Sequence, residues 1–526
     1  MQITRKSAIK KLAAVLGSTT LLGFTHPEAK STKATNNAPG KLDYNVKDFG
    51  AAGDGQTDDT KAINKAIAAA ANDGGGTILF PSGTYRSGSV HLKSHITLYL
   101  GRGAVLEATD EASAYDPAEP FNGPQYQDFG HSHWHNSLIW GENLHDVSIE
   151  GPGMIYGKGL LREEAKNKSQ KGIGNKSIAL KNCRNIQLKD FTIKHGGWFG
   201  LLATGVDNLR VENLLIDTNR DGMDIDCCRN VHVTNCTVNS PRDDAIVPKS
   251  SYALHKAITT QDMTISDCIV SGFPEGTVLD GTAKMPENAN NGHTGTGRIK
   301  FGTESNGGFK NITISNCVFE HCRGLALETV DGALLEDVSI SNITMRDIGN
   351  APIFLRLGSR MRGPKSIPVG QLRRVNISNV VVHNADNATG CLISGIPGHQ
   401  IEDVKISNVR IDYEGGGTSK EANIQPPENA HHYPEPDMFG KMPSYGFYIR
   451  HVKGIELSNV KLTYEQADMR PAFRLNDVED ADFRFVKAEH ESQVPEFSLQ
   501  NVKDFKAFEC KSVPNTSLEN VQSKEI

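Results

Sequence analysis

The chain has 526 residues, including 51 glycines and 23 prolines, and a formal charge of -6 at pH 7. This length is well beyond the roughly 250–300 residues at which one compact core stops growing, so the chain forms either several domains or one elongated repeat. Charged residues at 22% and aromatic residues at 7% exclude collagen, an extended coiled coil and wholesale disorder. The negative charge and the absence of a basic stripe argue against nucleic acid as a partner.

The first residues have the pattern of an export signal. Four basic residues between Arg5 and Lys11 precede an apolar run from Leu12 to Phe24. This run is too short to cross a bilayer, but it has the length of a signal-peptide core. We therefore predict a signal peptide over residues 1–29.

The remaining chain is predicted to be an exported protein, with a linker over residues 30–41 and one folded domain over residues 42–526. No later segment has 18 continuous apolar residues, so we expect no membrane span after signal removal. The segment Thr4–Lys10 is similar to a twin-arginine signal that lacks its second arginine, which leaves the export route open. We expect a monomer.

One helix is predicted ahead of the repeats. Thr57-Asp58-Asp59 supplies a cap and first-turn acids, and Gly74-Gly75-Gly76 ends the segment. Between them lies an apolar stripe of Ile63, Ala66, Ile67 and Ala70. Because the open end of a stack of strands invites aggregation, we interpret this helix as an N-terminal cap.

A short pattern of alternating apolar and polar residues that ends in asparagine recurs along the chain. Alternation with a period of two predicts a half-buried strand. Related copies begin at Ile186, Met263, Val375 and Ile455. The clearest copies are Asn208–Asn213, Asn230–Asn235, Asn311–Asn316, Asp337–Asn342 and Asp403–Asn408.

The spacing of these copies indicates an all-β fold, a right-handed parallel β-helix. The first copies are separated by 23 and 22 residues, close to one coil of such a solenoid, and the later gaps of 26 to 51 residues imply inserted loops. The asparagines are expected to stack at successive bends, where this residue tolerates the left-handed backbone. A β-propeller or sandwich is the alternative, but the chain lacks a regular blade period and hairpin turns.

The nine cysteines do not indicate disulfides or a metal site. Their number is odd, and Cys183, Cys236, Cys268 and Cys317 recur beside the strand copies, which favours small buried side chains in the core. Cys227-Cys228 is too tight for ordinary zinc spacing. No metal and no cofactor are expected.

Three aspartates fall at the same end of adjacent copies. Asp221 lies 22 residues before Asp243, and Asp244 follows directly. One coil of separation places these carboxylates nearly above one another, and clustered like charges raise at least one pKa. Such a set suits cleavage of a glycosidic bond, which needs one protonated carboxyl and one ionised carboxylate.

Other interpretations of these acids remain open. A single Asp in this context, such as Asp224 or Asp226, is typical of a turn. Arg220 and Arg242 offer charge neutralisation for the three acids. Clustered aspartates are also ligands for calcium.

At these residues the chain resembles glycoside hydrolase family 28, the polygalacturonases and rhamnogalacturonan hydrolases. The resemblance begins at Asn45–Ala51, continues through Gly53–Thr60 and covers most of the chain. Asn219-Arg220-Asp221-Gly222 is similar to the family's Asn-Thr-Asp-Gly element, and Asp243-Asp244 matches its paired aspartates.

The resemblance implies an inverting glycoside hydrolase. Asp243 is then the general acid, while Asp221 and Asp244 activate water. Inversion is associated with carboxyl groups about 6.5–9.5 Å apart. Neighbouring strand residues face opposite sides, so Asp243 and Asp244 both reach one cleft only if the backbone bends there. Pro241, just upstream, favours such a bend.

The chain also departs from the family pattern. The family's His-Gly element is missing near Gly297–Gly302, and its Arg-x-Lys element, which binds a carboxylate, is missing near Ala326–Glu328. Arg298 and Lys300 alternate onto one face and are candidates for binding a uronate carboxylate, or else neutralise the acids. Arg356 is a further candidate for substrate binding.

Three segments look like loops over a cleft: His131–His135, the insertion between Ser251 and Gly297, and Tyr433–Gly440. Trp134 is either a buried structural residue or a platform for a sugar ring. Loops that wall off an open groove convert it into a pocket that accepts only the end of a sugar chain. We therefore favour exo attack. The predicted function is release of galacturonic acid or a related residue from a pectic polysaccharide or oligosaccharide. The alternatives are a polysaccharide lyase and a non-catalytic pectin-binding β-helix.

Overall fold

The computed structural model describes residues 43–161, 175–285 and 295–526. The predicted signal peptide over residues 1–29 and the predicted linker over residues 30–41 lie outside these ranges. The described residues from Asp43 onward belong to one compact unit.

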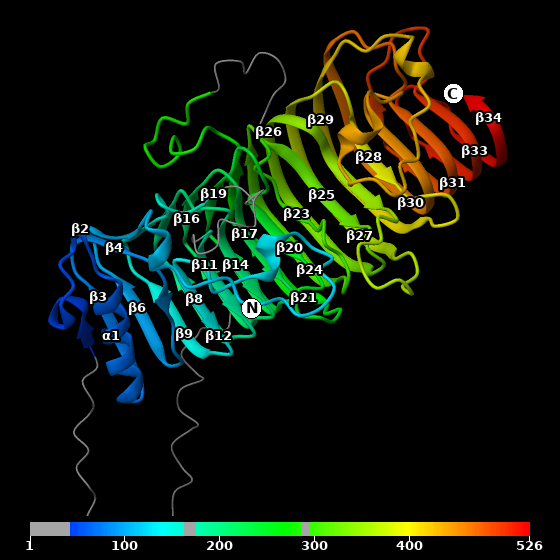
Figure 1. Ribbon diagram of the computed structural model, residues 1–526. Helices are drawn as coiled ribbons and strands as arrows, with labels where there is room; N and C mark the ends of the chain where they lie inside the picture. The colour runs from blue at the N-terminus through cyan, green and yellow to red at the C-terminus, as the bar shows by residue number, and fades with distance from the viewer. Residues whose placement is uncertain (1–42, 162–174, 286–294) are drawn as a thin grey trace, which may run out of the picture. The chain divides into compact units, whose positions relative to one another are not determined.

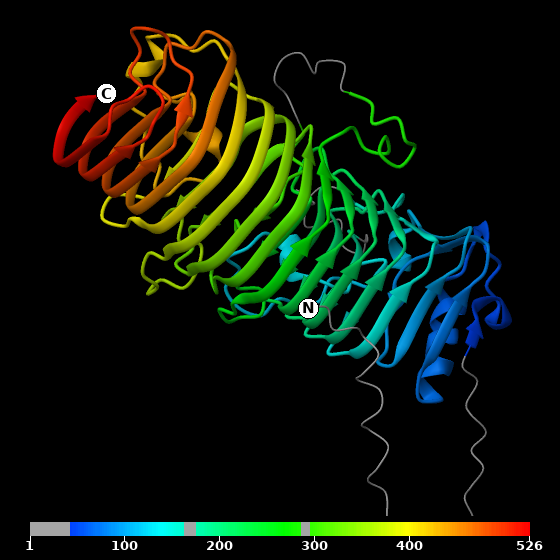
Figure 2. The same cartoon turned by 180° about the vertical axis from the view of Figure 1, so that it is seen from behind.

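The described residues form a parallel β-helix, as predicted from the strand copies. Successive coils place their strands side by side along the unit (Figures 1 and 2). Leu209, for example, pairs in parallel with Ile186 of the preceding coil and with Val231 of the following coil. The strands divide into a sheet of 28 and a sheet of six, the latter in the order β20-β17-β14-β11-β8-β5.

The elements that precede and form the early coils are short. They are β1 (Asp43–Asn45), η1 (Val46–Phe49), β2 (Asp54–Asp58), α1 (Thr60–Asn72), β3 (Gly76–Phe80), β4 (Gly83–Ser87), β5 (Val90–His91), β6 (Ile96–Leu100), β7 (Ala104–Ala108), η2 (Ala112–Ala114), η3 (Phe129–Ser132), β8 (Ile139–Glu142), β9 (His145–Glu150), β10 (Met154–Tyr156), β11 (Lys176–Lys181), β12 (Arg184–Lys189), β13 (Thr192–Lys194), β14 (Phe199–Thr204), β15 (Asp207–Glu212), β16 (Leu215–Asp217), β17 (Asp221–Asp226), β18 (Arg229–Thr234), β19 (Thr237–Asn239), β20 (Ile246–Lys249), β21 (Thr260–Ser266) and β22 (Ile269–Ser271).

Several later strands run continuously through the bends. They and their neighbours are β23 (Lys300–Phe301), β24 (Phe309–Glu320), β25 (Arg323–Thr329), β26 (Leu334–Leu357), β27 (Gln371–Ala385), β28 (Cys391–Ser394), β29 (Ile401–Gly415), η5 (Glu421–Asn423), η6 (Pro436–Phe439), β30 (Phe447–Gln466), β31 (Phe473–Arg484), β32 (Lys487–Ala488), β33 (Phe497–Phe508) and β34 (Thr516–Glu525). The last strand, β34, pairs antiparallel with β33.

Stacked asparagines at the bends confirm the prediction from the repeats. Asn316, Asn342 and Asn379 all have φ near +56°. Their amides form a ladder in which Asn342 Nδ2 donates to Asn316 Oδ1 at 3.0 Å, and Asn379 Nδ2 donates to Asn342 Oδ1 at 3.1 Å. Asparagine therefore both permits the left-handed bend and links each coil to the next.

We expect Asn342→Ala to lower the free energy of unfolding by about 1–2 kcal/mol, because alanine is strained in the left-handed region and loses both amide bonds. Asn342→Gly is the matched control, since glycine relieves the backbone strain but not the lost ladder. Urea unfolding should rank wild type above the glycine variant and the glycine variant above the alanine variant. Equal stability of the two variants would contradict the backbone contribution.

The core runs through the middle of the coils. Ile and Val at alternate strand positions are buried, including Ile312, Ile314, Val338 and Ile340. All nine cysteines are buried and unpaired, as the spacing predicted. On the outside of the later coils, lysine or arginine alternates with glutamate from strand to strand, in the register Lys310, Glu336, Arg373, Glu402, Lys453, Glu479 and Lys503.

Helix α1 has the predicted buried stripe of Ile63, Ala66, Ile67 and Ala70. It packs against β1, β3, β5 and β6 at the N-terminal end of the coils (Figure 1). Its start differs from the prediction, because the Asp59 carboxylate accepts hydrogen bonds from Ala52 and Gly53 rather than capping the helix. No helix within the described ranges is long and apolar enough to cross a bilayer.

Candidate functional site

The three predicted aspartates come together where two coils of the six-stranded sheet begin. Asp221 is the first residue of β17, and the backbone N–H of Gly222 donates to the carbonyl of Asp244 at 3.0 Å. Asp243 and Asp244 lie in the bend ahead of β20, outside any strand. Neighbouring residues of a straight strand face opposite sides, but residues within a bend need not alternate. The bend expected near Pro241 therefore allows Asp243 and Asp244 to reach the same site.

Gly222 allows this close approach of the coils. A Cβ at this position would lie 2.5 Å from the carbonyl oxygen of Ala245 and 2.3 Å from a methyl group of Val238. Both distances are too short for real contacts, so only glycine can pack against the neighbouring coil at position 222. Asp221, the residue before it, is thereby held beside that coil.

One carboxylate oxygen from each of Asp221, Asp243 and Asp244 lies within 4.8 Å of the others. Burial raises the pKa of Asp221 well above its usual range, and the charges of Asp243 and Asp224 add to this effect. Burial and the neighbouring Asp244 also raise the pKa of Asp243, against the opposing charge of Arg220. Asp243 remains partly exposed, with 26% of its side chain accessible.

Asp244 differs from its two neighbours. Burial opposes its charge, but Lys300 and Arg298 outweigh burial and hold the pKa of Asp244 well below its usual range. Arg298 Nε donates to Asp244 Oδ1 at 2.8 Å, and Lys300 Nζ lies 3.4 Å from Asp244 Oδ2. The cluster therefore contains an ionised carboxylate beside two carboxyls that favour protonation, the division of states that acid and base chemistry requires.

Arg298 and Lys300 lie one coil after Asp244 and face the same side, as their alternation predicted. Each has 2% of its side chain exposed. They are therefore buried in the acidic cluster, where both pair with the Asp244 carboxylate.

The predicted cleft loop Tyr433–Gly440 crosses to this cluster from a distant coil. Glu435 accepts hydrogen bonds from Arg298 and, at 2.9 Å, from Arg323 Nη1. The Tyr433 hydroxyl lies 3.2 Å from Lys300 Nζ. The sequence marked this segment as a loop, but it contained no signal that Glu435 meets Arg298 across 137 residues of chain.

A second charged layer supports the acids from within β17 and β20. Lys249 Nζ lies 3.7 Å from Asp224 Oδ2 and 3.2 Å from Glu304 Oε2. His131 lies 3.1 Å from Asp224. Asp226 accepts a 2.7 Å hydrogen bond from the Ser251 N–H. The turn interpretation of Asp224 and Asp226 was therefore wrong: both belong to β17 and are fully buried, with Asp224 beneath the His131 segment.

Other predicted loop residues are structural. Trp134 is 1% exposed and donates from its indole nitrogen to Thr204 Oγ1 at 3.1 Å, so it is not a sugar platform. Trp198 carries the Arg220 guanidinium 4.3 Å above its ring. The insertion after Ser251 is only partly a loop, because it includes β21 and β22 of the next coil.

Arg356 has 1% exposure and directs its guanidinium to backbone carbonyls. It donates to Gly395 at 3.0 Å and to Glu428 at 2.9 Å. Arg356 thus anchors the segment that precedes Tyr433. None of these hydrogen bonds connects Arg356 to the three aspartates.

The geometry of the three aspartates alone would also fit a divalent cation, since their oxygens converge within 4.8 Å. However, Asp244 is already paired with Arg298 and Lys300, and Lys249 interacts electrostatically with Asp221. These buried cations oppose a further positive charge, so the arrangement favours carboxyl chemistry over the calcium alternative.

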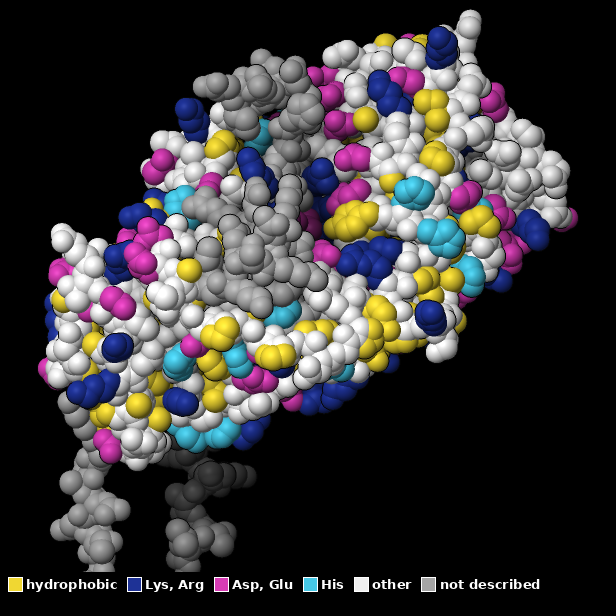
Figure 3. Space-filling model, viewed as in Figure 1, with side chains coloured by type: hydrophobic (Ala, Val, Ile, Leu, Met, Phe, Trp, Pro, Cys, Tyr) yellow, Lys and Arg dark blue, Asp and Glu magenta, His cyan; other side chains and the backbone are white. Residues whose placement is uncertain are grey.

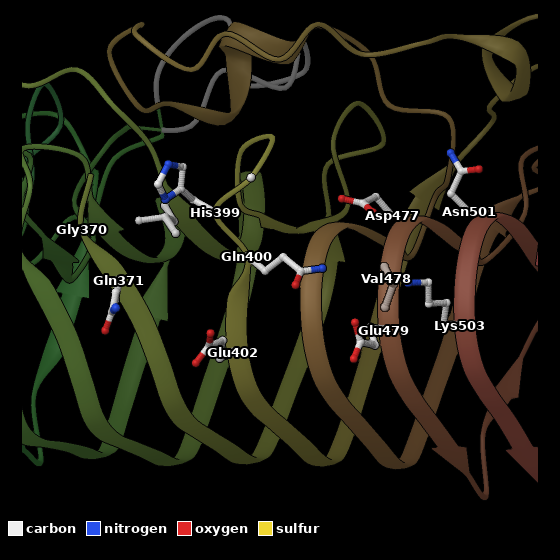
Figure 4. Close-up of a pocket in the computed structure, with 12 residues that line it drawn as sticks. Gly370, Gln371, His399, Gln400, Glu402, Asp477, Val478, Glu479, Asn501 and Lys503 are labelled. Atoms are coloured by element: carbon white, nitrogen blue, oxygen red, sulfur yellow. The ribbon is translucent and has the colours of Figure 1, made fainter. Parts of the chain in front are cut away.

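The face in Figure 3 has a hollow near its middle, where acidic and basic side chains gather. A separate cavity of about 520 Å³ lies on the later coils and is lined by Gln371, Glu402, Glu479 and Lys503 (Figure 4). Three of these belong to the alternating ladder of charges, a structural feature. We therefore assign the candidate site to the aspartate cluster, where burial and neighbouring charges perturb the pKa values of three carboxyl groups.

Comparison with known proteins agrees with the fold. A probable polygalacturonase from Vitis vinifera is 27% identical over 389 residues, which cover 69% of this chain and 73% of that protein. The family 28 exopolygalacturonase of Yersinia enterocolitica superposes with a TM-score of 0.61 at 20% identity, covering 85% of this chain and 79% of that chain. An exopolygalacturonase from Thermotoga maritima has a TM-score of 0.61 at 17% identity, covering 81% and 92%.

The predicted right-handed parallel β-helix and the resemblance to glycoside hydrolase family 28 are thus confirmed, with this chain as a divergent relative. The family described as "Rhamnogalacturonase A/epimerase, pectate lyase-like" matches residues 44–328, a range that includes Asp221, Asp243, Asp244, Arg298 and Lys300. The chain belongs to the rhamnogalacturonase A/epimerase, pectate lyase-like family.

Proposed function

We propose that this protein is an exported glycoside hydrolase that cleaves a glycosidic bond of a pectic polysaccharide or oligosaccharide, with inversion and from the chain end. The observation that carries the proposal is the division of ionisation states. Asp244 is held ionised by Arg298 and Lys300, while burial favours the protonated form of Asp243. The likeness to polygalacturonases supports the pectic substrate.

In the proposed reaction, Asp243 gives its proton to the glycosidic oxygen as the bond to the anomeric carbon breaks. Asp244, with Asp221, orients a water molecule and takes its proton as the water oxygen bonds to that carbon. The reaction consumes one water and leaves two sugar products. In this arrangement the partly exposed Asp243 faces the leaving group, and the buried Asp221 and Asp244 face the water.

The separation of the acids differs from the expected value. Their nearest oxygens lie within 4.8 Å, whereas carboxyl groups of inverting enzymes are about 6.5–9.5 Å apart. Inversion is nevertheless favoured here because both oxygens of Asp244 face cations and the raised pKa of Asp221 makes it a weak nucleophile. A water between the carboxylate of Asp244 and the carboxyl group of Asp221, at about 2.8 Å from each, fits the observed spacing.

The exo mode is supported by the loop that carries Tyr433 and Glu435. This segment reaches the acids from a distant coil and contacts Lys300, a neighbour of Asp244. We infer that it blocks a bound sugar chain from extending past Asp244. A polymer chain that cannot run past the acids is cut only near its end.

The test is product analysis on oligosaccharides of galacturonic acid and of mixed pectic backbones. We expect monosaccharide or short terminal products and, by proton NMR in the first minutes, an anomer opposite to that of the substrate. Chelator should leave the rate unchanged. A retained anomer would contradict the assignment of the water, and unsaturated products would establish the lyase alternative.

The pH profile provides a second test. Asp243 must be protonated, so the rate should fall as pH rises through its raised pKa; Asp244 must be ionised, so the rate should fall as pH drops through its lowered pKa. Arg220 Nη2 lies 2.7 Å from Asp243 Oδ2 and opposes protonation. Arg220→Gln should therefore move the alkaline limb upward by roughly one pH unit and leave the acid limb in place.

Arg242→Gln is the matched control for the pH profile, because Arg242 precedes Asp243 directly but is exposed. Its profile should match that of the wild type. If both variants shift the alkaline limb equally, general surface charge rather than the Arg220 contact sets the pKa of Asp243.

A further inference from the structure

Three cations from neighbouring coils converge on the carboxylate of Glu435. Arg298 Nη2 and Arg323 Nη1 bind its two oxygens separately, the latter at 2.9 Å, and Lys300 Nζ lies 3.5 Å from Oε1. A carboxylate held by two guanidinium groups and an ammonium is a complete anion site. The anion that occupies this site is the side chain of Glu435, a residue of the protein itself.

The same segment seals these cations from solvent. Arg298 and Lys300 are each 2% exposed, and Glu435 is 18% exposed. The Tyr433 ring lies 5.1 Å from Lys300 Nζ and is 53% exposed. With the segment in place, a sugar beside Asp244 meets Tyr433 and the edge of Glu435 rather than the free charges of Arg298 and Lys300.

The local balance of charge depends on Glu435. Glu328 is buried 3.8 Å from Lys300, and burial raises its pKa to about 8, so it is mainly neutral at pH 7. The buried cations Arg298 and Lys300 are then countered by Asp244 and Glu435. Without the Glu435 carboxylate, these two cations would face one ionised acid, Asp244, an arrangement that attracts an anionic sugar.

We propose that Glu435 is a specificity-determining residue: it supplies from the protein the carboxylate that Arg298, Lys300 and Arg323 would otherwise take from a uronic acid, so the sugar unit accommodated beside Asp244 is neutral. This inference rests on the proposed function. It narrows the substrate class to pectic chains in which a neutral hexose or deoxyhexose adjoins the cleaved bond.

The decisive measurement is binding, because it does not depend on turnover. Galacturonate and galactose differ by a carboxylate in place of a hydroxymethyl group. We expect Glu435→Ala and the shape-conserving Glu435→Gln to raise the affinity ratio of galacturonate over galactose by about tenfold relative to wild type, as gain of a charge-assisted contact implies. Titration calorimetry gives the ratio, and galacturonate should raise the melting temperature of both variants more than that of wild type.

Asp437→Asn is the matched control. Asp437 lies in the same segment, 3.6 Å from Arg323, but is 66% exposed and does not contact Arg298 or Lys300 in the described structure. Its affinity ratio should equal that of wild type. An unchanged ratio in both Glu435 variants, or an equal change in Asp437→Asn, would overturn the proposal.

A second arm uses turnover of oligogalacturonides and their carboxyl-reduced, neutral counterparts. Wild type should have the higher kcat/KM on the substrate with a neutral sugar beside the cleaved bond, and Glu435→Gln should shift this preference toward the acidic substrate. A wild-type preference for the acidic sugar would overturn the proposal. If the wild type binds these sugars but cleaves none of them, the proposed hydrolase function fails while the binding ratio still decides the role of Glu435.

Discussion

Replacing Asp243 with Asn is expected to lower kcat on pectic oligosaccharides by about 10²–10⁴-fold, because an amide cannot donate the proton that the departing glycosidic oxygen requires. The side chain keeps its shape, and its carboxylate is only partly buried. We therefore expect unchanged circular dichroism and a melting temperature close to that of wild type. The rate should be measured by release of reducing sugar.

Asp280→Asn serves as the control for this loss of activity. Asp280 is an exposed aspartate in the loop after β22, where its carboxylate accepts a hydrogen bond from Thr282. The control should retain the wild-type rate. Full activity of Asp243→Asn would remove Asp243 from the proposed mechanism and with it the general acid.

Arg298→Met is expected to lower the free energy of unfolding by about 3–5 kcal/mol at pH 7, since it removes one of the two buried cations, Arg298 and Lys300, that Asp244 and Glu435 share. Both carboxylates have a pKa below its usual range in the folded protein. Their stabilising contribution is therefore complete above the unfolded pKa and is lost as pH falls through the folded pKa. The difference between wild type and variant should shrink correspondingly in acid.

Arg323→Met tests whether burial is the cause. Arg323 binds the same Glu435 carboxylate, but its side chain is 27% exposed. We expect a loss of about 1 kcal/mol or less, because solvent screens a partly exposed pair. Urea unfolding of both variants at pH 7 and at pH values below 4 makes the comparison, because the contribution is lost only below the unfolded carboxyl pKa of about 4. Equal losses would show that the Arg298 pairs gain nothing from their burial.

Much of the fold was predictable because its signals are local. Alternation of apolar and polar residues determines which side chains enter the core, and asparagine at each bend suits a left-handed backbone. The 22-residue separation of Asp221 and Asp243 equals one coil, so proximity of the acids followed from counting along the chain. The same logic placed Arg298 and Lys300 on one face.

The contacts that the sequence did not predict have a common cause. Asp224 and Asp226 were interpreted as turn residues because short polar runs are typical of turns, yet the His131 segment and Ser251 bury them on β17. Arg356 was a candidate for binding substrate, but its partners are the carbonyls of Gly395 and Glu428. In each case the deciding partner comes from another coil or from a long loop.

By itself, the sequence determined the β-helix, the order of its coils and the meeting of Asp221, Asp243 and Asp244, because these follow from periodicity and from the spacing of neighbouring coils. Only the tertiary structure decided which of the acids is ionised and what Arg298 and Lys300 hold. The ionisation states depend on burial and on charges through space, and Glu435 enters the cluster from 137 residues away. No local pattern encodes a contact of that length.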